Sequence, residues 1–198
     1  MKKKKRKSQK AKDCPYKDFL ILFPFAAKEV QQDLLARLKK QPRPNTLCGK
    51  DVPESLNGIS YGALDDLHSS SEDKDPVGSC AKVLLGIDPY QLLEEDVNDV
   101  FGFTNFVTRE LQRINKLFKD IKVNYSPEEI AAGIRDLDFG SFGVLDWYAK
   151  RMGITNQNEV RDVAWVRIYQ CMKNDCQKNN FERKLSQQYR SKLKSKGK

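Results

Sequence analysis

Apolar residues recur at spacings of three and four along most of the chain, which is the period of one helix face. The longest such stripe predicts a helix from about Glu95 to Lys122. Its apolar positions are Val100, Phe103, Phe106, Val107, Leu111, Ile114, Leu117, Phe118 and Ile121. A brief helix at 89–94 leads into it, and the other predicted helices lie at about 27–40, 60–68, 76–85, 127–136, 141–152 and 157–178. The pattern predicts an all-α protein, a compact bundle of about six to seven helices with disordered basic termini.

Residues typical of helix ends support several of these boundaries. Asp75–Pro76 and Asp88–Pro89 each place a capping acid before a proline at the first helical position. Residues 126–129, Ser-Pro-Glu-Glu, have the pattern of a capping box. Gly86 and Gly153 stand where a left-handed residue commonly ends a helix. We therefore expect helices to begin or end at these points, and Thr155 or Asn156 to cap the last one.

Three stretches lack a clear helical pattern. The apolar run from Phe19 to Phe23 fits either a strand or an extended docking segment, because periodicity does not separate them in so short a run. Residues 45–57 contain Pro, Gly and Asn and predict a loop. After Lys178 the apolar residues thin out, so the last helix either continues or frays. The remaining apolar positions there are Phe181, Leu185, Tyr189 and Leu193.

Charge is concentrated at the two ends of the chain. Residues 1–12 carry eight Lys or Arg and no acid, and residues 173–198 carry nine basic and two acidic residues. Because the whole chain has a net charge of +9, the middle, residues 13–172, is at −6. Basic low-complexity ends bind polyanions non-specifically and are often disordered. The predicted divisions are a disordered basic arm over 1–13, an apolar segment, helix and loop over 14–58, a helical core over 59–178, and a basic C-terminal tail over 179–198.

The sequence contains no pattern that predicts a catalytic, cofactor or metal site. Five cysteines form no Cys-x-x-Cys pair and His68 is the single histidine, so the clustered ligands of a zinc site are missing. An odd cysteine count without a secretory signal favours reduced thiols in the cytoplasm. No apolar run approaches the ~18 residues of a membrane span. Residues 138–140 spell the kinase Asp-Phe-Gly triplet, but the other kinase motifs are missing. We expect a cytoplasmic protein that is not an enzyme and binds neither cofactor nor membrane.

The stretch from Asp136 to Tyr169 is the most aromatic part of the chain. It holds both tryptophans, two of the seven tyrosines and two of the ten phenylalanines. Aromatic side chains supply large buried areas, so such a segment is typical of a packing centre or a contact surface. We predict that it forms the packing centre of a helical C-terminal half.

The order of elements from Ile59 to Phe118 resembles that of a known protein family. A short segment, Ser60-Tyr-Gly-Ala-Leu-Asp-Asp-Leu67, precedes a polar loop and a helix that ends in Val83-Leu-Leu-Gly-Ile87. An Asp-Pro start follows, and then a long helix that ends in Arg113-Ile-Asn-Lys-Leu-Phe118. This succession resembles the tail assembly chaperones of long-tailed bacteriophages, and residues 139–153 resemble the second half found in some of them. The resemblance covers about 59–172, whereas the basic arm and residues 19–25 depart from it.

The resemblance implies a non-enzymatic function in the host cytoplasm. Such chaperones coat the phage tape-measure protein, keep it soluble and recruit tail-tube subunits. A protein that binds amphipathic helices needs an exposed apolar groove. The candidates for its lining are Phe103, Phe106, Phe139, Phe142, Trp147 and Tyr148.

Two other functions fit the same sequence. One is a structural virion or connector protein, and the other is a basic accessory protein that binds nucleic acid non-specifically through its tails. The expected partners are therefore the tape-measure and tail-tube proteins, a second copy of the chain, or nucleic acid.

Overall fold

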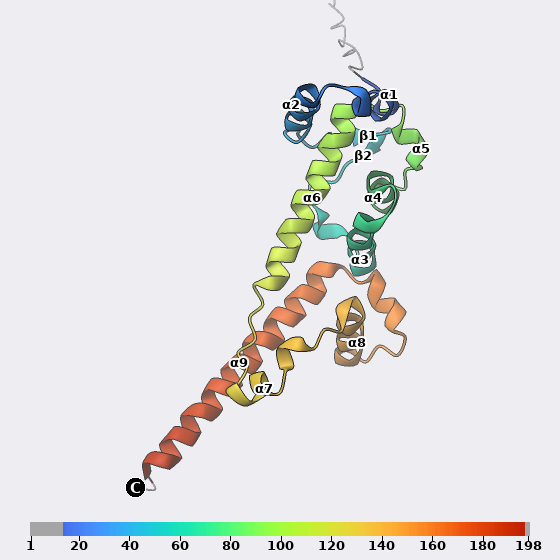
Figure 1. Ribbon diagram of the computed structural model, residues 1–198. Helices are drawn as coiled ribbons and strands as arrows, with labels where there is room; N and C mark the ends of the chain where they lie inside the picture. Colours follow the sequence, from blue (N-terminus) through green and yellow to red (C-terminus); the bar gives the residue numbers. More distant parts are fainter. Residues whose placement is uncertain (1–13, 197–198) are drawn as a thin grey trace, which may run out of the picture. The chain divides into compact units, whose positions relative to one another are not determined.

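A computed structural model describes residues 14–196, with side chains as far as residue 192. Over these residues the chain forms nine α-helices, five short 3-10 helices and one two-stranded hairpin, so the all-α prediction is confirmed (Figure 1). The α-helices are α1 (Tyr16–Leu22), α2 (Lys28–Leu38), α3 (Tyr61–Ser69), α4 (Pro76–Leu85), α5 (Pro89–Leu92), α6 (Val97–Lys119), α7 (Pro127–Ala131), α8 (Gly140–Met152) and α9 (Trp165–Lys196). The strands are β1 (Thr46–Leu47) and β2 (Lys50–Asp51). The 3-10 helices are η1 (Phe23–Phe25), η2 (Leu56–Gly58), η3 (Ser70–Glu72), η4 (Ile134–Asp136) and η5 (Gln157–Asp162).

The contacts divide the chain into two compact units. Among the described residues, unit 1 comprises 14–54 and Leu67–Glu110, and unit 2 comprises Ser55–Asp66 and 111–196. Both α3 and α6 contribute residues to each of the two units.

Unit 1 begins with a helix where the sequence predicted a strand or an extended segment. The apolar residues Tyr16, Phe19 and Phe23 have helical spacing, and rings of the first two pack edge-on against Phe101 of α6. Phe19 also contacts the rings of Tyr16 and Phe23. The prediction was wrong because these aromatic contacts favour one face of a helix, and Tyr16 lies outside the apolar run from Phe19 to Phe23.

The backbone just before α1 is fixed on the turn that leads into α6. The Tyr16 N–H donates to the Glu95 carbonyl at 2.8 Å, and the Val97 N–H donates to the Cys14 carbonyl at 2.9 Å. These bonds flank an antiparallel bridge between Pro15 and Asp96. The N-terminal end of the described chain is therefore hydrogen-bonded into unit 1.

The predicted loop at 45–57 contains a short hairpin. Thr46 pairs with Asp51 and Leu47 with Lys50. The two residues between the strands, Cys48 and Gly49, both have positive φ (47° and 73°), which is the backbone of a tight hairpin turn. The Cys48 N–H also donates to a Glu95 carboxylate oxygen at 3.1 Å. This side-chain anchor lies far away in sequence, so local propensity does not reveal it.

The predicted caps of α4 and α5 are confirmed. A carboxylate oxygen of Asp75 accepts from the Gly78 N–H at 2.9 Å, and one of Asp88 accepts from the Tyr90 N–H at 3.0 Å. Gly86 ends α4 with φ of 62°. The buried apolar residues of unit 1 are Tyr16, Leu38, Leu47, Val52, Leu67, Ala81, Ile87, Leu92, Val97, Val100, Phe103, Phe106 and Val107.

Unit 2 is built around Trp165, the first residue of α9. Its indole N–H donates to the Leu56 carbonyl at 2.7 Å, and its ring packs beside those of Phe118 and Tyr169. The ring of Phe118 also meets that of Tyr169 edge-on. This cluster confirms the prediction that the aromatic stretch contributes to the packing centre of the C-terminal half.

The last helix starts later than predicted. Residues 157–162 form the 3-10 helix η5, capped by the Asn156 side chain, and α9 begins only at Trp165. Between them Val163 is extended (φ −73°, ψ 135°), and its carbonyl accepts from the Tyr61 N–H at 2.8 Å. A bridge between Ser60 and Ala164 adjoins this bond. The helical pattern is interrupted because its backbone pairs with the chain just before α3.

The predicted helix at 127–136 is also shorter. The capping box is present, with Ser126 and Glu129 bonding reciprocally, but α7 ends at Ala131. Gly133 then adopts φ of 83° and is followed by η4. A left-handed residue cannot continue a right-handed helix, so one predicted helix becomes two short turns.

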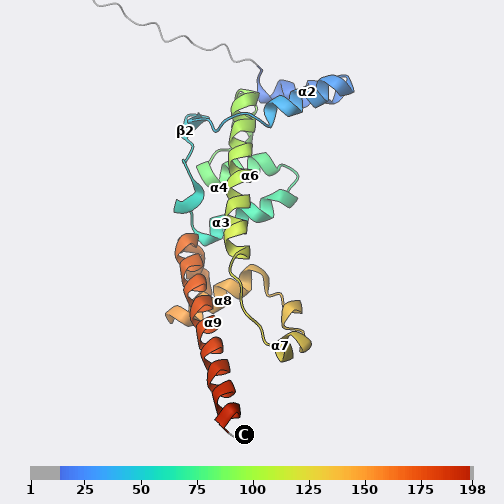
Figure 2. The same cartoon turned by 90° about the vertical axis from the view of Figure 1, so that its left-hand side faces the viewer.

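The sequence left open whether the last helix continues or frays after Lys178, and in the structure it is helical as far as Lys196. Figure 2 shows α9 continuing past α7 within unit 2. The predicted disordered arm over 1–13 lies outside the described residues.

Candidate interaction surfaces

The six residues predicted to line a partner-binding groove have different environments. Phe103 and Phe106 are buried in unit 1, and Tyr148 is buried in unit 2. Trp147, also in unit 2, is half-buried beside Tyr148. Only Phe139 and Phe142 expose most of their surface, at 70% and 59%. Of the six predicted residues, Phe139 and Phe142 are therefore exposed, whereas Phe103, Phe106 and Tyr148 belong to the core.

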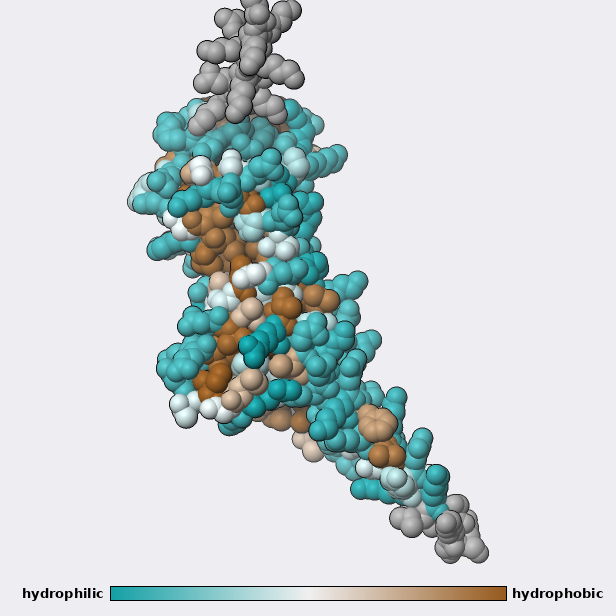
Figure 3. Space-filling view, turned by 180° about the vertical axis from the view of Figure 1, so that it is seen from behind, coloured by the Kyte–Doolittle hydropathy of each residue, from teal (hydrophilic) through white to brown (hydrophobic). Residues whose placement is uncertain are grey.

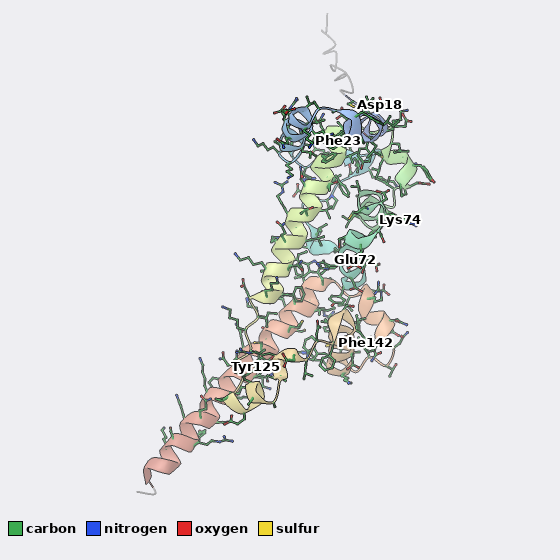
Figure 4. All side chains as sticks on the ribbon, viewed as in Figure 1. Asp18, Phe23, Glu72, Lys74, Tyr125 and Phe142 are labelled. Atoms are coloured by element: carbon green, nitrogen blue, oxygen red, sulfur yellow. The ribbon has the colours of Figure 1, made fainter. Side chains whose placement is uncertain are left out.

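Phe139 and Phe142 lie with Leu137 in the segment that leads into α8 and its first turn, and we call these three exposed residues the Phe139 surface. Figure 4 labels Phe142 on α8. A carboxylate oxygen of Asp138 accepts from the Gly140 N–H at 2.8 Å, and Gly140 has φ of 54°. The Asp-Phe-Gly triplet at 138–140 therefore forms a turn. It places Phe139 immediately before the helix and Phe142 on its first turn.

Gly143 lies close to the Phe139 side chain. A Cβ on Gly143 would lie 2.5 Å from the Phe139 Cβ, so the absent side chain leaves room for the phenylalanine. Further along α8, Leu145 and Ala149 are buried, and Asp146 accepts from the Gln157 side-chain amide at 2.7 Å. The exposed rings therefore project from a helix that is fixed on unit 2.

Unit 1 carries a second exposed apolar surface, which we call the α1–α2 surface. Its residues are Leu20, Ile21, Leu22, Phe25 and Val30. The Gln31 side-chain amide donates to the carbonyls of Phe23 and Ala26 at 3.0 and 2.9 Å, which holds the turn between the two helices. The sequence predicted a strand or an extended docking segment for the apolar run from Phe19 to Phe23, and it did not predict the helix α1.

A third apolar surface lies on the C-terminal part of α9, where Phe181, Leu185 and Tyr189 are exposed. We call these three residues the α9 stripe. Figure 3 shows apolar atoms among hydrophilic ones on this part of the helix. The sequence placed these residues four apart, but it left open whether the helix persisted that far.

The charged residues of unit 2 form ion pairs that brace its helices. Arg161 donates to carboxylate oxygens of Asp65 at 3.1 Å and Asp66 at 2.6 Å. Arg151 binds Asp175 through two nitrogens, at 2.9 and 3.1 Å. Adjacent acids such as those of α3 can also hold a metal, but here both contact the same guanidinium. In the part of the chain that the structure describes, no group of three or more His, Cys, Asp or Glu is arranged to hold a metal ion.

One pair joins α7 to α9. The Arg183 guanidinium donates to both carboxylate oxygens of Glu129, one of them at 2.9 Å, and Glu129 also accepts from the Ser126 N–H at 2.8 Å. The Arg183 hydrogen bond and then the Ser126 backbone bond lower the pKa of Glu129 from 4.5 to about 2. This residue therefore stays ionised in the folded protein over a pH range in which the unfolded chain protonates it.

We expect the pair to make unit 2 sensitive to acid. A carboxyl group with a lowered folded pKa stabilises the folded state above its unfolded pKa, and this stabilisation is lost as pH falls from 4.5 to about 2. The thermal midpoint of Glu129→Gln should be lower than that of the parent at neutral pH and should converge with it near pH 2. Thermal unfolding followed by circular dichroism across this range measures the convergence.

Glu182→Gln is the matched control, because its contact with Lys178 is 3.9 Å long and exposed. A constant difference between the thermal midpoints of the parent and of Glu129→Gln at every pH would contradict the lowered pKa of Glu129.

No helix among residues 14–196 is long and apolar enough to cross a membrane. No family model matches the sequence, and no curated protein or solved structure matches it either.

Proposed function

We propose that this chain is a tail assembly chaperone of a long-tailed bacteriophage and is not an enzyme. In this role it binds the tape-measure protein in the host cytoplasm, keeps it soluble and recruits tail-tube subunits. The helices α3, α4, α5 and α6 follow one another in the order on which the family resemblance rests, with the Asp88–Pro89 start before α5. This agreement supports the proposal.

The observation that carries the proposal is the Phe139 surface. Large apolar side chains that stay exposed on an ordered helix start are typical of a protein contact site. The Asp138 turn and the packing of Phe139 over Gly143 hold the surface before any partner arrives. A surface that is already ordered loses little conformational entropy on binding, which favours recognition of an apolar helix face.

Co-expression tests the function directly. The full chain is produced together with a phage tape-measure protein, and the soluble fraction is captured through a tag on this chain. The proposal expects a soluble complex that contains both proteins. A tape-measure protein that remains insoluble in the presence of this chain would rule the function out.

We expect the double substitution Phe139→Ser with Phe142→Ser to reduce the recovered complex by at least about tenfold, because central aromatic anchors commonly carry more than ~1.4 kcal/mol of binding free energy. Quantification of the captured tape-measure protein measures this loss. The thermal midpoint should change little for Phe142→Ser alone, because that ring is 59% exposed.

Tyr90→Ser is the matched control, since Tyr90 is an aromatic residue that is 79% exposed in unit 1. Equal recovery with the double variant and with Tyr90→Ser would remove the Phe139 surface from the binding site.

A structural virion or connector protein is the second candidate function. Three groups of exposed apolar residues within the described part of the chain favour it, because a subunit fixed among several neighbours buries more than one surface. A chaperone should be missing from purified virions, whereas a structural protein should be present at a defined copy number. Mass spectrometry of purified particles separates the two.

A further inference from the structure

One face of the C-terminal part of α9 contacts other residues of unit 2. The Cys176 thiol and the Asn180 side-chain amide both contact the Lys122 carbonyl, at 3.2 and 2.8 Å. One turn further on, Arg183 binds Glu129. These contacts come at spacings of four and three, so they lie on one side of the helix. From residue 177 to residue 192, all residues other than Asn180 and Arg183 are exposed.

The α9 stripe lies on the opposite side. Phe181, Leu185 and Tyr189 are spaced four apart, which places them on one helix face, and at about 100° per residue this face points away from that of Cys176, Asn180 and Arg183. Their exposures are 63%, 37% and 60%. The three form a row of apolar anchors of the kind that meets a partner helix.

The charges around the stripe define what can cover it. Lys178 and Lys192 lie at its two ends, and Lys184 lies along one edge. Glu182 is the only acid between residues 177 and 192, and its carboxylate is 3.9 Å from Lys178. Glu182 lies along the other edge, so three of the four charged residues around the stripe are basic.

These charges disfavour two alternative occupants. Pairing of the stripe with its counterpart on a second copy would place lysines against lysines, and such like-charge contacts oppose association. Nucleic acid would be attracted by the basic residues, but it would leave a row of Phe, Leu and Tyr without an apolar partner. A helix with an apolar face and acidic edges satisfies both features.

We propose that the α9 stripe binds an amphipathic helix of a partner protein whose apolar face is flanked by Asp or Glu. The inference rests on the proposed function in one respect, because it assumes that the chain acts by binding another protein. It goes further by naming the chemistry of the bound segment and the helix that receives it.

Fluorescence anisotropy with two synthetic helical peptides tests the inference on the full chain. One labelled peptide has about four heptads with Leu at positions a and d and Glu at e and g, and its twin has Lys in place of Glu. Charge repulsion keeps each peptide from pairing with itself. We expect the acidic peptide to bind and its basic twin not to bind.

The variant that carries Phe181→Ala, Leu185→Ala and Tyr189→Ala should bind the acidic peptide at least about 30-fold more weakly, because it removes all three anchors. Alanine is the strongest helix former, so α9 remains helical, and circular dichroism confirms this. The matched control carries Asn179→Ala, Ser186→Ala and Gln187→Ala, which are exposed residues away from the stripe. It should bind as the parent does.

Several results would overturn the inference. They are the absence of binding, equal binding of the two peptides, and acidic-peptide binding that survives the triple change in the stripe. The last would assign the affinity to other basic residues, such as those of 1–12. A stripe-dependent dimer in sedimentation, or a short DNA duplex whose binding needs the three anchors, would instead assign the stripe to those occupants.

The outcome is separable from that of the proposed function. Peptide binding together with failed tape-measure solubilisation would retain the α9 site and reject the chaperone function. Successful solubilisation without peptide binding would do the reverse.

Discussion

Replacing Trp165 with alanine should destabilise unit 2 by about 3–5 kcal/mol, the range for removing a large buried aromatic side chain. The ring is almost fully buried and packs beside Phe118 and Tyr169. The Arg113 guanidinium lies 6.0 Å from its centroid. Truncation would open a cavity within unit 2, between η2, α9 and the part of α6 from Leu111 onward. Urea unfolding followed by circular dichroism measures the loss.

Two further substitutions separate the causes of this effect. Trp165→Phe keeps most of the apolar volume but removes the donor to the Leu56 carbonyl, and it should cost about 1–3 kcal/mol. Trp147→Ala is the matched control, because Trp147 is only half-buried. If Trp147→Ala and Trp165→Ala destabilise the protein equally, Trp165 is not the centre of the core.

Replacing Gly102 with alanine should destabilise unit 1 although the site is inside a helix. On propensity alone, alanine would stabilise α6 by about 1 kcal/mol. Gly102 is buried, and an added Cβ would overlap the Pro42 carbonyl oxygen and lie 3.3 Å from the Pro44 Cδ. Backbone cannot move aside as a flexible side chain does, so we expect a net loss of about 1–3 kcal/mol. Thermal and urea unfolding give its sign and size.

Gly58→Ala is the control, because nothing lies within 4 Å of a Cβ built there. The thermal midpoint of Gly58→Ala should stay close to that of the parent. A higher midpoint for Gly102→Ala would mean that the segment at 42–44 does not press on α6 as the structure indicates.

The helices whose ends are marked by local chemistry were predicted well. Asp75, Asp88 and Ser126 cap their helices in the expected way, and Gly86 and Gly153 adopt the left-handed conformation that ends α4 and α8. Caps act within one turn of the chain, so the residues that decide them are neighbours in the sequence.

The predictions that were wrong concern elements that depend on residues distant in the sequence. The start of α9 shifts to Trp165 because Val163 bonds to Tyr61, about a hundred residues earlier. The α1 helix forms against Phe101, and the hairpin turn at Cys48 is anchored by Glu95. Each of these elements is decided by a partner distant in sequence, which no local pattern contains.

The same distinction applies to the candidate surfaces. An apolar stripe at helical spacing indicates that one helix face will be shielded from water. It does not indicate whether that face is covered by residues of the same chain or by another protein. Phe103 and Phe106 are covered by their own unit, whereas Phe139 and Phe142 are not. The aromatic composition was therefore visible in the sequence, and the division between core and contact residues was not.

The sequence by itself determined the all-α class, most helix positions and the uneven charge, because each depends on periodicity, capping or composition within a short stretch of chain. Only the tertiary structure decided that the chain divides into two units, that α9 continues through residues 179–196, and that Phe181, Leu185 and Tyr189 stay uncovered. The physical reason is that burial is a property of which segments meet. That choice depends on the sum of distant contacts and not on the pattern of any one segment.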